Sequence, residues 1–155
     1  MQDAEGKNRK LYAFVMTLSH SRYRYVEFTF SKNQVSWAQL HINAFNFFSG
    51  VPNRIILDNL KAGIIIYDPT LNETYSELSR FYSFTIDPPK VFKPEHKGKV
   101  ERSIRIVKEQ LIAGKSYHDI IEANSEAIKW CKNEISYMVC TTTGSKPIDL
   151  YLFEE

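Results

Sequence analysis

Cysteine is scarce in this chain, whose 155 residues include only Cys131 and Cys140. Two cysteines make neither a disulfide scaffold nor a metal-binding framework, and we expect both to be reduced, partly buried thiols. The sequence also lacks an apolar run of membrane-spanning length, and no signal peptide precedes its first apolar segment. From these absences we expect a soluble, cytoplasmic protein.

Low-complexity segments and internal repeats are absent as well, and the composition is that of a folded domain. Hydrophobic residues make up 43% of the chain and aromatic residues 14%. A disordered chain would be poorer in both kinds of residue. The length suits one domain of ordinary size.

Charge is nearly balanced overall, with 20 basic and 18 acidic residues and a net charge of +2. The distribution is more informative, because seven basic residues crowd into one stretch: Lys90, Lys93, Lys97, Lys99, Arg102, Arg105 and Lys108. Such a cluster can attract phosphate groups. A solvated helix face is the other interpretation, and the charge pattern alone does not separate the two.

Hydrophobic spacing predicts an α/β fold. Apolar or alternating runs predict strands at residues 11–18, 23–30, 54–57 and 83–86, the first two joined as an antiparallel hairpin. Helical spacing predicts helices at residues 34–48, 72–82, 98–113 and 117–137. The run Ile64–Tyr67 is ambiguous between strand and loop, and Pro88–His96 reads as a loop. This order indicates a mixed sheet with helices packed on it.

Two acids stand out by their positions. Asp58 follows a buried strand, where a carboxylate reaches the rim of a sheet, although it could simply cap the turn that follows. Glu101 lies on the basic helix, about 90° from the centre of its apolar stripe, which places it on the flank of the helix. A solvated ion-pairing residue is the alternative for Glu101.

Together the two acids could share a metal ion. Hard ions such as Mg²⁺ take oxygen ligands, usually one or two protein carboxylates plus substrate phosphate. Two such ions can activate an attacking hydroxyl and stabilise the leaving oxygen. The surrounding lysines and arginines would hold DNA phosphates. In contrast, the four histidines show no spacing typical of metal ligands, and we expect Trp37 and Trp130 to be core residues rather than platforms for base stacking.

Two short motifs carry a resemblance to a known family. Asp58-Asn59-Leu60-Lys61 and Lys97-Gly98-Lys99-Val100-Glu101 resemble the second and third acidic motifs of DDE transposases. The most similar group is the IstA-type insertion-sequence transposases, which work with an ATPase helper. Further matches lie at Gly6-Lys7, in the hairpin at residues 19–22, and at residues 41–45, 50–52 and 142–144, with Pro147 after them.

The resemblance implies a ribonuclease H-like domain that hydrolyses a phosphodiester bond and transfers the freed strand. Asp58 and Glu101 would be catalytic metal ligands for Mg²⁺, with Mn²⁺ as a substitute. DNA would contact basic residues on and around the two motifs, namely Lys61, Lys93, Lys97, Lys99, Arg105 and Lys108. We also expect self-association and an ATPase helper protein as a partner. Residues 1–138 would form the catalytic core and residues 139–155 its C-terminal extension.

One departure from the family bears on activity. The family's first catalytic Asp lies in a strand upstream of the Gly-Lys turn, and this sequence begins at that turn. Asp3 is too close to Gly6 to be that residue and reads as a loop residue. We therefore expect the first, central strand of the sheet to be missing and the chain alone to be inactive or nearly so. A non-catalytic DNA-binding or assembly remnant and a stand-alone nuclease of the same fold are the alternatives.

Overall fold

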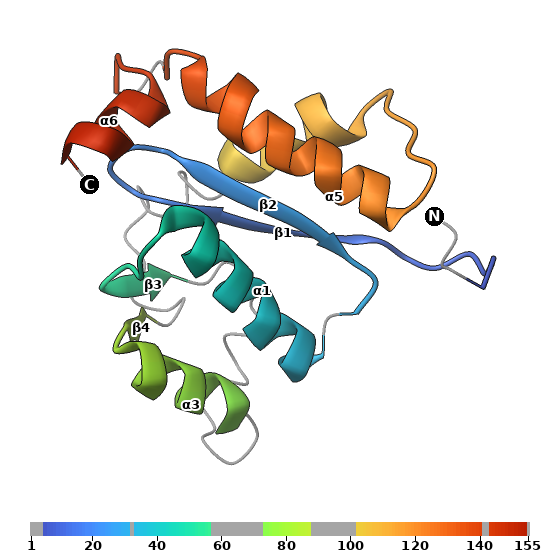
Figure 1. The fold of residues 1–155 in the computed structure, drawn as a ribbon, viewed down its shortest axis with the longest axis horizontal. Coiled ribbons are helices and arrows are strands. Elements are labelled where there is room, and N and C mark those ends of the chain that lie inside the picture. The colour runs from blue at the N-terminus through green and yellow to red at the C-terminus, as the bar shows by residue number, and fades with distance from the viewer. Residues whose placement is uncertain (1–4, 32, 57–72, 88–101, 141–142, 155) are drawn as a thin grey trace. The chain divides into compact units, whose positions relative to one another are not determined.

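A computed structural model describes residues 5–31, 33–56, 73–87, 102–140 and 143–154. The chain divides into two compact units, which are treated separately below. The first comprises Met1–Ser31 with Ser103–Glu155, and the second comprises Lys32–Arg102. Figure 1 shows the elements of both units in chain order.

An antiparallel hairpin is the centre of the first unit. Strands β1 (Tyr12–Thr17) and β2 (Arg24–Thr29) pair with Val15 opposite Val26. The turn is closed by the Arg22 N–H, which donates to the Leu18 carbonyl at 3.0 Å. Arg22 adopts a left-handed backbone with φ of 65°. The hairpin predicted from the sequence is confirmed, and each strand is one residue shorter at both ends than predicted.

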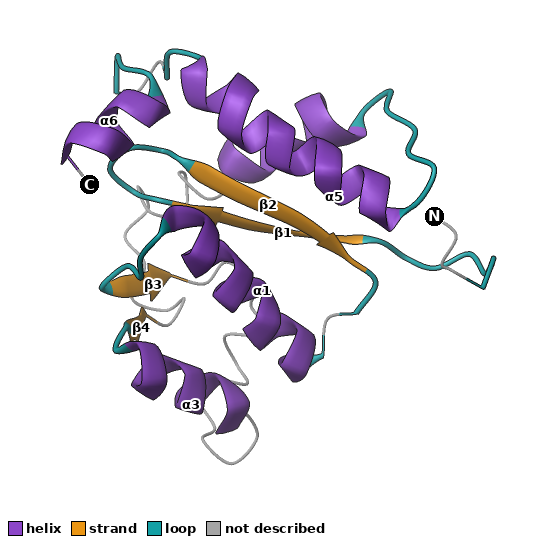
Figure 2. Cartoon of the chain, viewed as in Figure 1, coloured by secondary structure: helices purple, strands orange, loops and turns teal. Residues whose placement is uncertain are grey.

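Helical segments pack along this hairpin. Helix α5 (Ile120–Lys129) runs along β2 and continues into a π-helical turn, η3 (Trp130–Glu134), and a 3₁₀ turn, η4 (Ile135–Tyr137) (Figure 2). A row of fully buried or nearly buried side chains faces inward: Ala123, Ala127, Trp130, Cys131 and Ile135. The predicted core position of Trp130 is confirmed, and both cysteines are free thiols.

The start of this helix was predicted wrongly. Helix α5 begins at Ile120 rather than at residue 117, because the Asp119 side chain caps it by accepting from the Glu122 N–H at 2.8 Å. Tyr117 instead belongs to the preceding loop, where its hydroxyl donates to the Leu111 carbonyl at 2.6 Å. Acceptance of an N–H by an aspartate side chain is a common way to begin a helix.

Helix α5 also forms side-chain hydrogen bonds to the backbone of β2. The Asn124 side chain accepts from the Phe28 N–H at 2.6 Å and donates to the Phe28 carbonyl at 3.1 Å. An N–H points in one direction only, so this Phe28 N–H faces away from β1. The amide of Asn124 therefore acts at this point as a neighbouring strand would.

The C-terminal helix α6 (Pro147–Glu154) belongs to the same unit. Its Tyr151 packs against Tyr23 with ring centroids 4.6 Å apart. Burial, with Tyr151 as the next cause, raises the pKa of Tyr23 to about 12. The predicted boundary between a core at 1–138 and an extension at 139–155 stays a prediction.

The second unit combines two helices with two short strands. Helix α1 (Gln34–Phe48) begins and ends where the sequence predicted. Strands β3 (Arg54–Ile56) and β4 (Thr85–Asp87) pair in parallel, and α3 (Glu73–Tyr82) packs on α1. Phe45 contacts the rings of Tyr82 and Phe84 at 5.0 and 5.7 Å.

Strand β4 begins two residues later than predicted. Ser83 takes a left-handed conformation with φ of 59°, and the Phe84 N–H donates to the Ser79 carbonyl at 3.2 Å. These two residues therefore end helix α3 instead of starting the strand. The error concerns only the start of the strand, since the strand itself is present and pairs in parallel with β3.

The described strands form two separate pairs, one antiparallel and one parallel. The predicted mixed α/β architecture is thus confirmed. Several predicted features lie outside the described residues: Asp3, the run Ile64–Tyr67, the loop Pro88–His96 and the start of the helix predicted at 98–113. In the parts of the chain that are described, no helix is long and apolar enough to cross a membrane.

Candidate functional site

Most of the predicted site residues fall outside the described parts of the chain: Asp58, Lys61, Lys93, Lys97, Lys99 and Glu101. Arg105 and Lys108 are described, and both are exposed. The proximity of Asp58 and Glu101 therefore stays a prediction. The nearest described elements are β3, before Asp58, and the helical residues that follow Glu101.

Asp58 follows the end of β3 by two residues. Strand β3 pairs in parallel with β4, and the register places Ile56 beside Asp87, the last residue of β4. The carboxyl ends of parallel strands meet at one edge of a sheet, where α/β proteins place functional side chains. The position of Asp58 stays a prediction, and Asp87 is an acid at the end of the neighbouring strand, one residue beyond the strand predicted at 83–86.

Glu101 immediately precedes the helical residues 102–107, which continue into a π-helical turn, η2 (Lys108–Ile112). The sequence predicts an apolar stripe of Val100, Ile104, Val107 and Leu111 on this helix. Val107 and Leu111 are buried, whereas Ile104 is only half-buried. Ser103 is buried one turn before Val107, at 2% exposure. The buried face of this segment therefore follows Ser103, Val107 and Leu111, with a serine at its first position.

The buried hydroxyl of Ser103 joins this helical segment to the hairpin. It accepts a hydrogen bond from the Thr17 hydroxyl at 2.9 Å and from Arg24 Nε at 3.3 Å. Thr17 and Arg24 lie opposite each other at the turn end of β1 and β2. The last residue of one strand and the first residue of the next thus meet at one side chain of the segment that follows Glu101.

Arg24 is the unexpected member of this group. It is 4% exposed, and desolvation by burial is the main cause that lowers its pKa. The sequence carried a signal, since Arg24 alternates in register with Val26 and Phe28, which are both buried. The sequence contains no such signal for Ser103, because a serine beside charged residues usually indicates a solvated helix face.

Histidine contributes no metal site in the described residues. His41 is 1% exposed, and its Nδ1 hydrogen-bonds to the Trp37 carbonyl at 2.8 Å. Burial lowers the pKa of His41 to about 4. Across the described ranges, no three side chains of His, Cys, Asp or Glu gather as a metal site would require.

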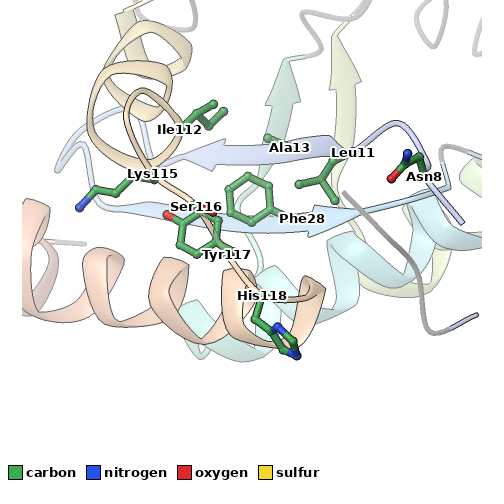
Figure 3. A pocket seen from close by; sticks show the side chains of 9 residues that line it. All are labelled: Asn8, Leu11, Ala13, Phe28, Ile112, Lys115, Ser116, Tyr117 and His118. Atoms are coloured by element: carbon green, nitrogen blue, oxygen red, sulfur yellow. The ribbon is translucent and has the colours of Figure 1, made fainter. Parts of the chain in front are cut away.

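A cavity of about 540 Å³ opens in the first unit (Figure 3). Phe28 and Tyr117 contribute aromatic rings, and Lys115 and His118 lie on its border. The remaining lining residues are Asn8, Leu11, Ala13, Ile112 and Ser116. None of these side chains is a carboxylate, so this cavity lacks the ligands that Mg²⁺ prefers.

Comparison with known proteins gives consistent results at the level of sequence and fold. No protein-family profile matches the chain. A protein of Mycobacterium tuberculosis named as a transposase is 34% identical over 130 residues, which are 82% of this chain and 32% of that protein. The IS21-like insertion-sequence transposase of Bacteroides fragilis is 31% identical over 159 residues, with 97% of this chain and 30% of that protein covered.

Two solved structures share the fold. The catalytic core domain of HTLV-2 integrase, solved in complex with magnesium, aligns with a TM-score of 0.67 and 16% identity over 92% of this chain and 86% of that one. The catalytic core domain of BIV integrase aligns with the same TM-score and 17% identity over 98% and 89%. The chain spans about a third of the length of the transposases it matches.

Proposed function

Since this chain has the ribonuclease H-like fold of integrase catalytic cores and is a relative of the insertion-sequence transposases, we propose that it is the DNA strand-transfer domain of a mobile element. Water would hydrolyse a phosphodiester bond at the end of the element. The freed 3′-hydroxyl would then attack target DNA. The observation that carries this proposal is the order of the two acidic motifs along the chain, one beginning two residues after β3 and one ending immediately before the helical residues 102–107.

Asp58 and Glu101 are the proposed metal ligands. Their carboxylate oxygens suit Mg²⁺, and Mn²⁺ can take the same place. The bound ions would polarise the reacting phosphate and activate the attacking oxygen. The protein's own contribution is to hold the two carboxylates and the DNA in fixed positions, because phosphoryl transfer of this kind depends on positioning and charge neutralisation.

Basic residues around Glu101 are the proposed DNA contacts. Arg105 and Lys108 are exposed, as a phosphate-binding role requires. At about 100° per residue, Arg105 is about 40° from the direction of Glu101 if the helix extends back by one position. The other proposed contacts are Lys61, Lys93, Lys97 and Lys99. Contacts of this kind bind phosphate without reading base sequence.

Self-association and an ATPase helper protein are proposed for the larger protein that such a domain serves. The support is the relationship to an IS21-like transposase and the sequence resemblance to IstA-type enzymes. A non-catalytic remnant that only binds DNA is the second candidate. It differs from the first in one respect that can be measured, since its DNA binding would not depend on a divalent metal.

DNA binding tests the proposal through the salt dependence of affinity. The variant with Lys93, Lys97, Lys99, Arg105 and Lys108 all changed to alanine should bind duplex DNA much more weakly. Each lost phosphate contact should also flatten the slope of log affinity against log salt concentration by about 0.9. The matched control changes Lys129 and Lys132, which are exposed elsewhere in the same unit, to alanine.

The control variant should bind DNA as the unchanged chain does. Equal binding by all three proteins would show that the basic cluster serves another purpose. Normal binding that is unaffected by Mg²⁺ in every assay, together with absent catalysis in any extended form of the chain, would favour the non-catalytic candidate.

A further inference from the structure

The cavity of the first unit (Figure 3) has no part in the proposed metal chemistry, since none of its lining side chains is a carboxylate. One wall is the hairpin, where Ala13 of β1 lies directly opposite Phe28 of β2. Both residues line the cavity, and the small alanine side chain leaves room beside the larger ring. The cavity therefore depends on a specific pair of residues in the two strands.

The facing wall is the segment that links η2 to α5. After the π-helical turn η2, Ala113 is extended and Gly114 takes a left-handed conformation with φ of 69°, which glycine adopts without strain. Residues 115–118 then line the cavity, and Ile112 contributes an apolar side chain that is 45% exposed. Because π-helical turns are uncommon and often lie at functional sites, this wall is a plausible place for a ligand.

Two aromatic rings are held at the cavity in fixed positions. The Tyr117 hydroxyl donates to the Leu111 carbonyl at 2.6 Å, and the backbone of Phe28 is hydrogen-bonded to the Asn124 side chain. The two ring centroids are 6.3 Å apart, and the ring planes are inclined by 42°. Since both rings are anchored before a ligand arrives, a flat aromatic ligand binds against them with little loss of side-chain entropy.

Charge at the border of the cavity is uneven. Lys115 and His118 are exposed and lie on opposite sides of the two rings (Figure 3). The ion pairs among the described residues involve neither of them. At the His118 side, the Glu122 carboxylate accepts from the His118 N–H at 2.5 Å, and Asp119 caps the same helix. An anionic group is therefore favoured at the Lys115 side.

We propose that this cavity binds one unpaired nucleotide, with its base against Tyr117 and Phe28 and its phosphate at Lys115. The volume of about 540 Å³ lies within the range of small-molecule sites, about 300–1,000 Å³. Aromatic rings for the bases and basic side chains for the phosphates are the usual means of binding single-stranded nucleic acid. The choice of a nucleotide among aromatic anions rests on the proposed action of the chain on DNA.

Quenching of 2-aminopurine, a fluorescent base, measures stacking in the full 155-residue chain. One probe is the free 2-aminopurine deoxynucleoside 5′-monophosphate, and the other is duplex DNA with 2-aminopurine in an unpaired overhang. We expect saturable quenching of both probes, and none when the base is paired inside the duplex. Tighter binding of the overhang identifies a DNA end as the source of the nucleotide, and tighter binding of the monophosphate identifies a free nucleotide.

Three variants locate the binding site. Ala13→Trp places a large side chain opposite Phe28 and should abolish quenching. Tyr117→Leu removes the ring and should weaken binding about tenfold, as expected for one lost stacking contact. Lys115→Gln should weaken binding about threefold and reduce its dependence on salt. The matched control Lys146→Gln, at an exposed position before α6, should bind both probes unchanged. A cooperative thermal transition in each variant shows that the fold is retained.

The outcomes separate this inference from the proposed function. If neither probe is quenched while duplex DNA still binds through the basic cluster, the inference is wrong and the proposed DNA contacts stand. Equal quenching by the unchanged chain, Ala13→Trp and Tyr117→Leu also overturns the inference, because the base then stacks elsewhere. Quenching that these two variants abolish, in a chain whose basic cluster does not affect DNA binding, supports the cavity and contradicts the proposed DNA contacts.

Discussion

Asn124→Ala should destabilise the first unit by removing the side chain that hydrogen-bonds to the backbone of β2. The Asn124 amide makes two hydrogen bonds to Phe28, of 2.6 and 3.1 Å, and Phe28 is 3% exposed. A hydrogen bond contributes about 1 kcal/mol net, and an unsatisfied buried group costs about 1–3 kcal/mol. Because Asn124 itself is half-buried and water can partly replace it, we expect a loss of about 2–4 kcal/mol in the free energy of unfolding.

Urea unfolding followed by circular dichroism measures this loss. A decrease of 2–4 kcal/mol corresponds to a fall in Tm of roughly 5–12 °C for a chain of this size. The dependence of the unfolding free energy on urea should not change, since the variant exposes no additional surface on unfolding. Asn124→Asp should be at least as harmful, because its carboxylate accepts from the Phe28 N–H but repels the Phe28 carbonyl.

The matched control is Asn133→Ala, which makes the same change at an exposed position of η3. It should alter the unfolding free energy by less than about 0.5 kcal/mol. Equal stability of Asn124→Ala and Asn133→Ala would refute the reasoning, since it would mean that water satisfies the hydrogen bonds of the Phe28 backbone as well as the Asn124 amide does.

Two further predictions concern buried titratable groups. Burial lowers the pKa of His41 from 6.5 to about 4, so the unfolded chain binds more protons than the folded chain between these values. The free energy of unfolding should therefore keep its full value above about pH 6.5 and decline by about 3 kcal/mol as the pH falls to about 4. Urea unfolding across this pH range should show the decline. The variant His41→Gln should remove most of this pH dependence. Burial also raises the pKa of the Cys131 thiol to about 12, so iodoacetamide at pH 8 should modify Cys140 well before Cys131. Mass spectrometry of the modified chain measures the two rates, and equal rates would contradict the buried position of Cys131.

The elements that could be predicted from sequence are those in which local and tertiary signals agree. Helix α1 is one of them, since apolar spacing, the Asn33 cap and the break before Pro52 all give the same bounds. Where local signals compete, the prediction shifts by a few residues. Ser83 and Phe84 look like strand residues but end α3, and Tyr117 looks helical but lies before the cap at Asp119.

Within the candidate site, some residues could be suggested from sequence motifs and others could not. Short motifs predict metal-ligand roles for Asp58 and Glu101, and these roles stay predictions; each motif lies beside an element whose pattern is readable from the sequence. The cluster of Thr17, Arg24 and Ser103 could not be predicted in the same way. It depends on contacts between side chains about eighty positions apart, and only the fold brings them together.

The central claim is that Asp58 and Glu101 perform metal-dependent strand transfer. The sequence resemblance implies a first acid in a strand upstream of Gly6-Lys7. The most direct measurement therefore uses this chain extended upstream by a strand that carries the first acid, incubated with labelled DNA and Mg²⁺ or Mn²⁺. We predict nicking and strand transfer by the extended chain only, abolished by Asp58→Asn or Glu101→Gln. Undiminished strand transfer by either variant, or robust activity of the 155-residue chain that is lost on changing Asp3, would contradict the account.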